Sequence, residues 1–309
     1  MTATLSDMIN EVSMNLSGYT LIQDRATYIT SNVADTASTI AAPTVLSLAS
    51  SDNLGKGIVE INEELFWVDN YDRLGNTATI SPYGRGYLGT TRAAHTAGDK
   101  VTISPIFPRF AIKRAINDTI SAIGSSIFAA DTTTIIYNTA VSAYRLPATG
   151  STLDIRNILS VAYQSIGPSK EWIPIKNWRF DGNANATAFD SKQTISIYDG
   201  ITSGRTIQIV YSTDPVPFTA NTDVFADKTK LPASCKDLVV LGATYRLLSN
   251  LDPARASMIS PQADETDAKR PYGSSQSITR QIYTLFTQRL NEEIRNQQDR
   301  YPIRIHYSV

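Results

Sequence analysis

The chain has 309 residues, which is enough for two or three domains with buried cores. Hydrophobic residues make up 42% of it and charged residues 18%, so it is apolar enough to fold but poorer in charge than a typical soluble domain. The net charge of −1 excludes a global positive field that would recruit nucleic acid, so any DNA contact must come from a local patch or a channel lining.

The single cysteine, Cys235, excludes an intrachain disulfide. Its place in LPASCKDLVVL predicts a small buried residue at a helix start rather than a nucleophile. The N-terminus lacks the basic and apolar regions of a signal peptide, and the apolar runs are shorter than the ~20 residues of a membrane span. No membrane partner is therefore expected.

The first predicted elements are a helix over about 4–17 and extended segments over 25–30 and 38–48. Apolar residues recur at helical spacing in the first of these, and Gly18 is predicted to end this helix. Short strand signals then gather between 58 and 104, with a hairpin turn predicted at Asn62-Glu63-Glu64. Together they predict a small β-domain over 31–105.

A stripe at period 3.6 predicts a helix over about 109–128. Strand signals return over 134–213, where TISIYD and RTIQIVY alternate around a turn that ends at Gly204. Trp172 and Trp178 flank a further strand and are expected to pack into this second β-domain.

From Pro232 the pattern is helical again, and this helix is expected to stop before Asp252-Pro253. Residues 260–277 read as a polar loop, and a last helix runs from Ile278 to near Tyr301. The final residues, PIRIHYSV, alternate like a strand with one buried face, which pairs either within its own subunit or with another protein.

Helical stripes cannot bury themselves alone, so the helices are expected to pack on each other. The predicted fold is α+β: a helical-bundle core of about four helices with two inserted β-domains and an extended C-terminal tail. Its parts are an N-terminal helix and lead-in (1–30), the first β-domain (31–105), a central helix (106–133), the second β-domain (134–230), a helical pair (231–301) and the tail (302–309).

The residues that carry chemistry form no catalytic pattern. With two histidines, His95 and His306, and one cysteine, a zinc site would rest on carboxylates. The adjacent Glu63 and Glu64 are expected to point apart in a solvated turn, unlike a glycosidase pair. No catalytic, cofactor-binding or metal-binding residue is therefore predicted.

The loop GRGYLGT lacks the GK[ST] ending of a phosphate loop and lies between strands. A structural role is favoured: its glycines permit a left-handed backbone, while Arg85 and Arg92 satisfy carbonyls or a neighbouring carboxylate. The loop residues singled out are Arg85, Gly86, Tyr87, Gly89 and Arg92. In the last helix, interspersed arginines and acids indicate either a solvated face or a helix that lines a pore or grips a partner.

Four motifs carry a resemblance to the head-to-tail adaptors of tailed bacteriophages, also called head-completion or connector proteins. They are LSGYTLIQDRATYIT; the pair VEINEELFWV and GRGYLGTTRAAHTAGDKV; FPRFAIKRAINDTI; and DLVVLGATYRLL with QRLNEEIRNQQDRYPIRIHY. The chain is most similar to the adaptors of long-tailed phages that infect actinobacteria.

The resemblance implies a non-enzymatic virion protein of the neck, assembled in the host cytoplasm, that forms a ring, commonly a dodecamer. The ring would sit between the portal protein and the next neck or tail-completion protein. Its helices would surround double-stranded DNA that passes without sequence-specific binding. The portal-docking candidates implied are Arg300, Ile303, Arg304, Ile305, His306 and Tyr307. The β-domain over 31–105 would form the lateral or peripheral surface.

Two alternatives stay open: a tail-completion protein, and a tail-associated module that binds host glycan through Trp67, Trp172 and Trp178. Exposed coplanar rings would favour glycan binding, and buried rings the scaffold. An enzyme of unknown type is a further alternative. Residues 260–277 and 302–309 are expected to order only on assembly, because a polar loop and a lone strand cannot offset their ordering entropy.

Overall fold

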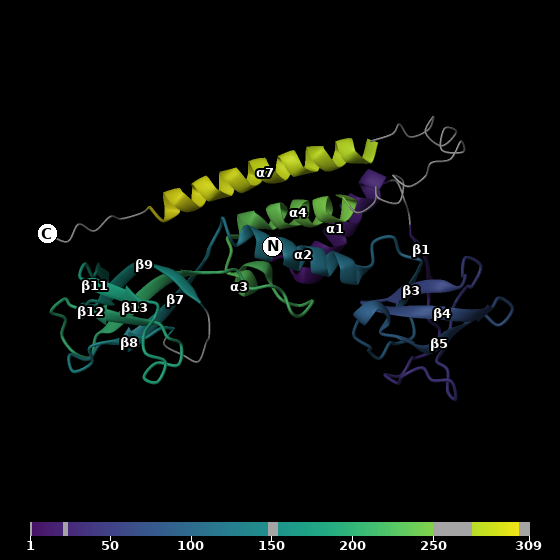
Figure 1. Cartoon of the computed structure of the whole chain (residues 1–309), viewed down its shortest axis with the longest axis horizontal. Helices are drawn as coiled ribbons and strands as arrows, with labels where there is room; N and C mark the ends of the chain where they lie inside the picture. The colour runs from purple at the N-terminus through teal and green to yellow at the C-terminus, as the bar shows by residue number, and fades with distance from the viewer. Residues whose placement is uncertain (1, 21–23, 148–153, 250–273, 303–309) are drawn as a thin grey trace. The chain divides into compact units, whose positions relative to one another are not determined.

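The computed structural model describes residues 2–20, 24–147, 154–249 and 274–302. Within these residues the chain forms thirteen β-strands in three sheets, together with five α-helices (Figure 1). The predicted 260–277 loop lies outside the described residues except at 274–277, which are helical, and the tail lies outside them from residue 303.

The prediction of a helical-bundle core is wrong, because the fold is built mainly on β-sheets. Two apolar clusters lie inside the sheets, one within 29–103 and one within 137–211. The strands are predicted from the sequence, but as insertions into a helical core, because amphipathic helices need a partner to bury their apolar stripes. In the structure the sheets enclose apolar clusters of their own.

The chain divides into two compact units. One comprises residues 1–5, 117–239 and 284–309, and the other comprises 6–116 and 240–283. Each boundary between them falls within a helix or at its first residue. The six-stranded sheet belongs wholly to the second unit, and the other two sheets belong wholly to the first.

The six-stranded sheet has the order β1-β6-β3-β4-β5-β2, with all neighbours antiparallel. Its strands are β1 (Arg25–Tyr28), β2 (Val45–Ser47), β3 (Gly57–Ile61), β4 (Glu64–Asp72), β5 (Thr77–Arg85) and β6 (Lys100–Ile103). A bridge between Ile29 and Leu48 brings the two outer strands together, so the sheet curls into a small barrel. Alternate side chains such as Leu46, Val68 and Ile80 fill its interior. The predicted hairpin is confirmed, but its turn is Asn62-Glu63, and Glu64 already belongs to β4.

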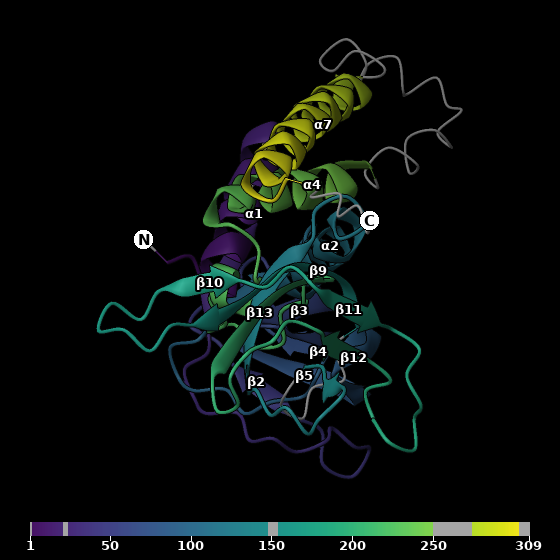
Figure 2. The same ribbon diagram turned by 90° about the vertical axis from the view of Figure 1, so that its left-hand side faces the viewer.

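The other two sheets share one apolar core and form a sandwich (Figure 2). The four-stranded sheet has the order β10-β9-β13-β7, and the three-stranded sheet the order β11-β12-β8. The strands are β7 (Ala129–Ile136), β8 (Tyr144–Arg145), β9 (Ile155–Gln164), β10 (Trp172–Pro174), β11 (Trp178–Asp181), β12 (Thr194–Ile197) and β13 (Thr206–Thr213). The predicted turn at Gly204 is confirmed by its positive φ of 89° just before β13.

The helices are α1 (Leu5–Thr20), α2 (Arg109–Ile123), α3 (Phe225–Thr229), α4 (Lys236–Ser249) and α7 (Ser274–Arg300), with 3-10 turns η1 (Tyr87–Gly89) and η2 (Ala233–Cys235). Gly18 does not stop α1, which continues to Thr20. The central helix ends at Ile123 rather than near 128, just before Gly124. None of the described helices combines the length and the apolarity that crossing a membrane requires.

Candidate functional site

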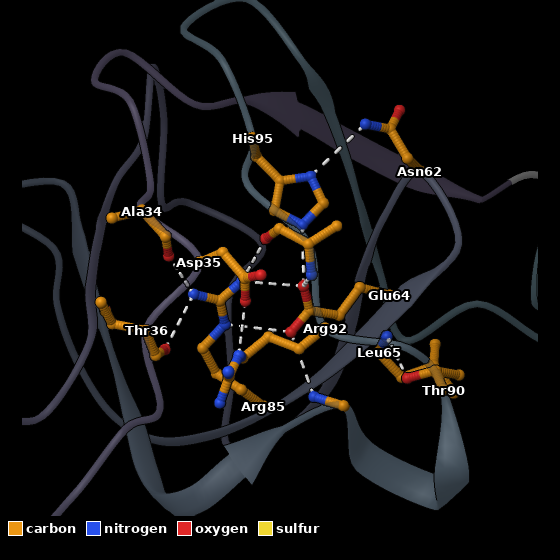
Figure 3. Close-up of polar contacts among 12 residues, drawn as sticks. Ala34, Asp35, Thr36, Asn62, Glu64, Leu65, Arg85, Thr90, Arg92 and His95 are labelled. Carbon is orange, nitrogen blue, oxygen red and sulfur yellow. Dashed lines mark hydrogen bonds and ion pairs between the residues drawn. The ribbon is translucent and has the colours of Figure 1, made fainter.

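A buried ionic cluster of Glu64, Arg85 and His95 lies inside the barrel (Figure 3). Their side chains are only 1%, 1% and 2% exposed. The Arg85 guanidinium donates twice to the Glu64 carboxylate, from Nε to Oε1 at 3.0 Å and from Nη2 to Oε2 at 2.8 Å. His95 Nε2 lies 2.9 Å from Oε2. Paired, charge-assisted bonds of this kind are among the strongest that side chains make.

Backbone groups complete the cluster. The N–H groups of Gly86 and Ala93 donate to the Glu64 carboxylate at 3.1 and 2.9 Å, so that it accepts five hydrogen bonds in all. The Arg85 guanidinium also donates to three backbone carbonyls, those of Ala34, Thr36 and Ala93. The cluster therefore links β4, the end of β5 and two loops by hydrogen bonds.

The electrostatics follow from these contacts. Burial alone would raise the pKa of Glu64, but hydrogen bonds from His95 and Arg85 outweigh it and lower the pKa to about 2. A carboxylate only accepts hydrogen bonds, so His95 donates from Nε2 to Glu64, and the Asn62 amide nitrogen lies 3.4 Å from its Nδ1. The cluster is saturated by the protein itself, which suits a structural element rather than a reacting centre.

The loop residues singled out in the sequence separate into buried and exposed ones. Arg85 satisfies a carboxylate and several carbonyls, as predicted, and Arg92 pairs with Asp35. Gly86 adopts φ 61°, and a Cβ there would lie 2.8 Å from the Thr90 carbonyl oxygen, so no larger residue fits. Tyr87 and Gly89 lie in η1.

Sequence reasoning missed Glu64 and His95 as members of this cluster. Glu64 was placed in a solvated turn, and the two-residue turn moves it to the first position of β4, facing inward. Its neighbour Glu63 does lie apart from it and pairs with Lys113 at 3.0 Å. The available signal was the buried face of β4: counting back from Phe66 in steps of two reaches Glu64.

A second buried carboxylate, Glu60, lies at the start of α2. Its Oε1 accepts the backbone N–H of Arg109, the first helical residue, at 2.6 Å. A carboxylate at a helix N-terminus satisfies a free N–H group and complements the helix dipole. Burial raises the pKa of Glu60 to about 7, and the bond from Arg109 opposes this shift only in part.

The C-terminal half of α7 is held by polar side chains. Arg289 donates to the Asp237 carboxylate at 2.8 Å and to Glu293 at 2.9 Å. Glu293 is buried and accepts the Ser234 hydroxyl at 3.0 Å. Hydrogen bonds from Arg289 to Asp237 and Glu292 raise the pKa of the guanidinium above its ordinary value. The arginine predicted on a solvated or partner-binding face thus serves its own subunit.

Gln297 forms a second attachment of α7. Its side chain accepts the Phe128 backbone N–H at 3.1 Å and donates to the Phe128 carbonyl at 2.6 Å. The rings of Phe128 and Tyr301 lie 5.8 Å apart. Arg300, one portal-docking candidate, is the last residue of α7 and is exposed. The other candidates, Ile303, Arg304, Ile305, His306 and Tyr307, lie outside the described residues.

Cys235 is buried at the end of η2, as predicted. Burial raises the pKa of its thiol to about 12, with the nearby Glu293 carboxylate adding to the shift. The reactive thiolate is therefore strongly disfavoured. Among the described residues, no group of three or more histidine, cysteine or acidic side chains is placed to hold a metal ion.

The tryptophans do not form a stacked platform. Trp178 packs against the sandwich core, as predicted, but Trp172 is 40% exposed on the short outer strand β10. Trp67 belongs to the barrel and contacts Tyr87, with the ring planes tilted by 40°. Trp178 is partly buried, and Trp67 lies in a different unit from Trp172 and is tilted against Tyr87. No observation therefore favours a pair of exposed coplanar rings that would bind a sugar.

Comparison with known proteins places the chain in a family. The model of the SU10 adaptor protein family matches residues 90–306, which takes in β6, α2, the sandwich, α4 and α7, while β1–β5 precede the match. No curated protein matches the chain. The match covers well over half of the 309 residues. A structural adaptor is also consistent with ionic clusters whose hydrogen bonds are made within the protein itself. The chain belongs to the SU10 adaptor protein family and is a phage structural adaptor protein, a component of the virion neck.

Proposed function

We propose that this adaptor forms a ring in the neck that joins the portal to the tail and lines the channel through which DNA leaves. The family match over residues 90–306 carries the proposal. An adaptor acts through its contacts with other neck or portal proteins. The stoichiometry, predicted to be twelve, and the likeness to adaptors of long-tailed actinobacteriophages remain predictions, as does assembly in the host cytoplasm.

The exposed residues of α7 support a role beside passing DNA. Uncharged polar side chains recur along it at helical spacing, at Gln281, Gln288, Asn291 and Gln298. The helix also exposes Arg280, Arg295 and Arg300, but the acids Glu292 and Asp299 lie among them, so charges of mixed sign would hold passing DNA only weakly. The net charge of −1 supports the same interpretation.

The attachment of α7 supports docking through the C-terminal segment. The bonds between Gln297 and the Phe128 backbone hold the last turns of the helix to the unit that contains the sandwich. The end of α7 is therefore a fixed attachment for the segment that follows it, which is the segment proposed to dock on a portal.

We propose further that the protein has no catalytic role. Glu64 and Arg85 are saturated by internal bonds, and the Cys235 thiol is buried. A measured activity lost on substitution of Glu63, Glu64 or His95 would contradict this.

Electron microscopy of mixtures with portal rings tests the proposed ring. Full-length protein mixed with purified portal rings should add a second ring on the exit face, visible in negative stain. A chain that lacks residues 302–309 should fail to add it. Absence of binding by the full-length chain would contradict the neck-ring proposal, while binding by the shortened chain would refute only the docking assignment.

A further inference from the structure

One face of the barrel carries almost no charge. Segments 36–51 and 77–91 contain a single charged residue, Arg85, although 18% of the whole chain is charged. Arg85 is buried in the ionic cluster, so the segments present no charged side chain to solvent. We refer to segments 36–51 and 77–91 together as the neutral face.

The two segments lie side by side. Strand β2 pairs with β5, with Val45 opposite Thr79. Beyond the strands, the Tyr83 N–H donates to the Ser38 carbonyl at 2.8 Å, and the Ser38 hydroxyl donates to the Ile80 carbonyl at 2.9 Å. The two segments that make up the neutral face are therefore joined along β2 and β5 and again at Ser38.

Large apolar side chains project from it. Ile40 is 83% exposed, Tyr83 80% and Leu88 65%, and Val45 is also exposed. Tyr83 and Leu88 both have positive φ, near 60° and 54°, a conformation that bulky side chains rarely adopt. Backbone strain of this kind persists only where surrounding structure enforces it, and it concentrates at functional sites.

The buried ionic cluster supplies that enforcement. Arg85 holds the carbonyl of Thr36, at the start of the first segment, and that of Ala93, just beyond the second (Figure 3). At the border of the face, Asp35 and Arg92 pair with each other. Exposed apolar side chains on a fixed backbone, bordered by an ion pair, are features of a protein–protein interface.

The absence of charge selects the partner. DNA or a strongly charged protein would gain nothing from this surface. A second copy of the chain offers a matching neutral surface: residues 132–144 also carry no charge and include the exposed Ile136 on β7, an edge strand of the four-stranded sheet. A contact between two different surfaces of identical subunits generates rings when it closes.

We propose that the neutral face of the barrel binds a second copy of this chain and forms a subunit contact of the ring. The inference deepens the proposed ring function and rests on it. It also assigns an assembly role to residues 36–91. All of these except residues 90 and 91 precede the part of the chain that the family model matches.

Sedimentation velocity of the full-length chain over a concentration series tests this contact. Tyr83→Asp should raise the dissociation constant of self-association at least tenfold, because it buries an unpaired charge. Tyr83→Asn is the matched control: Asn and Asp have the same shape and both tolerate positive φ, so Asn should weaken association less. Leu74→Asp adds the same charge at a 99% exposed residue beside Asp72 and Arg73, and should leave association unchanged.

Each result separates the interface from the wider function. Equal association of wild type and Tyr83→Asp would overturn the interface while leaving portal binding intact. If wild type is monomeric alone, the same variants are compared on portal rings, where ring formation by Tyr83→Asp refutes the interface and its loss supports it. Failure of wild type both to self-associate and to add a ring to portals overturns the interface and the neck ring together.

Discussion

At the scale of single residues, Glu64 is the side chain on which the barrel most depends. Glu64→Gln leaves the Arg85 guanidinium buried without its counter-charge, and breaking a buried pair in this way costs about 3–5 kcal/mol. We expect the free energy of unfolding, measured by urea denaturation, to fall by that order. Glu63→Gln is the control, because Glu63 makes a partly exposed pair with Lys113, worth about 1 kcal/mol or less.

Acid should destabilise the barrel through the same residue. The folded-state pKa of Glu64, about 2, lies below its ordinary value of 4.5, so its ionised form stabilises the fold above pH 4.5. That stabilisation is lost as the pH falls from 4.5 towards 2. Glu64→Gln should show a shallower loss of stability over this range, and an unchanged slope would contradict the assignment.

Glu60 should have the opposite pH dependence. Its folded-state pKa, about 7, lies above 4.5, so keeping it ionised in the folded barrel costs up to about 3 kcal/mol at pH 8. Stability should therefore fall as the pH rises from 4.5 to 7. Glu60→Gln keeps an acceptor for the Arg109 N–H and should flatten the curve of unfolding free energy against pH. Parallel curves for wild type and variant would show that Glu60 does not titrate in this range.

The sequence predicted the role of Arg85 but not its partner. A glycine-studded loop with arginines indicates internal hydrogen bonding, and Arg85 does bind backbone carbonyls. The identity of the carboxylate depends on turn length, since one residue more or less in the hairpin moves Glu64 between solvent and core. His95 lies 31 residues from Glu64, and no local pattern reports such a contact.

At the scale of elements, polar bonds hold the C-terminal part of α7 in addition to its partly buried apolar residues. Among residues 278–300 only Ile282, Glu293 and Gln297 are buried. We expect Gln297→Ala to remove both bonds to Phe128, at about 1–2 kcal/mol, and to speed amide hydrogen exchange over 290–300. Gln298→Ala, at the exposed neighbouring position, is the matched control and should leave exchange unchanged.

Helices and longer strands could be predicted from the sequence, whereas their assembly could not. The periods of α1, α2 and α4 are visible because each spans four turns or nearly so. Strand β8 has two residues, too few to show alternation. The bundle prediction followed from the need of amphipathic helices for a partner, and no local pattern shows that the sheets enclose apolar cores of their own.

At the scale of the whole molecule, weak DNA binding is the expected behaviour. The net charge is −1, and the exposed arginines of α7 are interspersed with acids, so little net positive charge is left to neutralise phosphates. We expect a dissociation constant for duplex DNA no tighter than about 10⁻⁶ M at physiological salt, measured by fluorescence anisotropy. Nanomolar binding with a steep salt dependence would contradict the proposal that the chain lines a conduit.

The path of the chain has a consequence for how the protein is made. The barrel strands occupy residues 25–103 and the sandwich strands 129–213, so each set leaves the ribosome as one piece and can fold during synthesis. Both compact units, however, also need residues of α7, which begins at Ser274. A nascent chain thus carries two formed β-cores well before either unit is complete. Each unit is therefore complete only after α7 has been synthesised, so the assembly of the neck has to follow the synthesis of this helix.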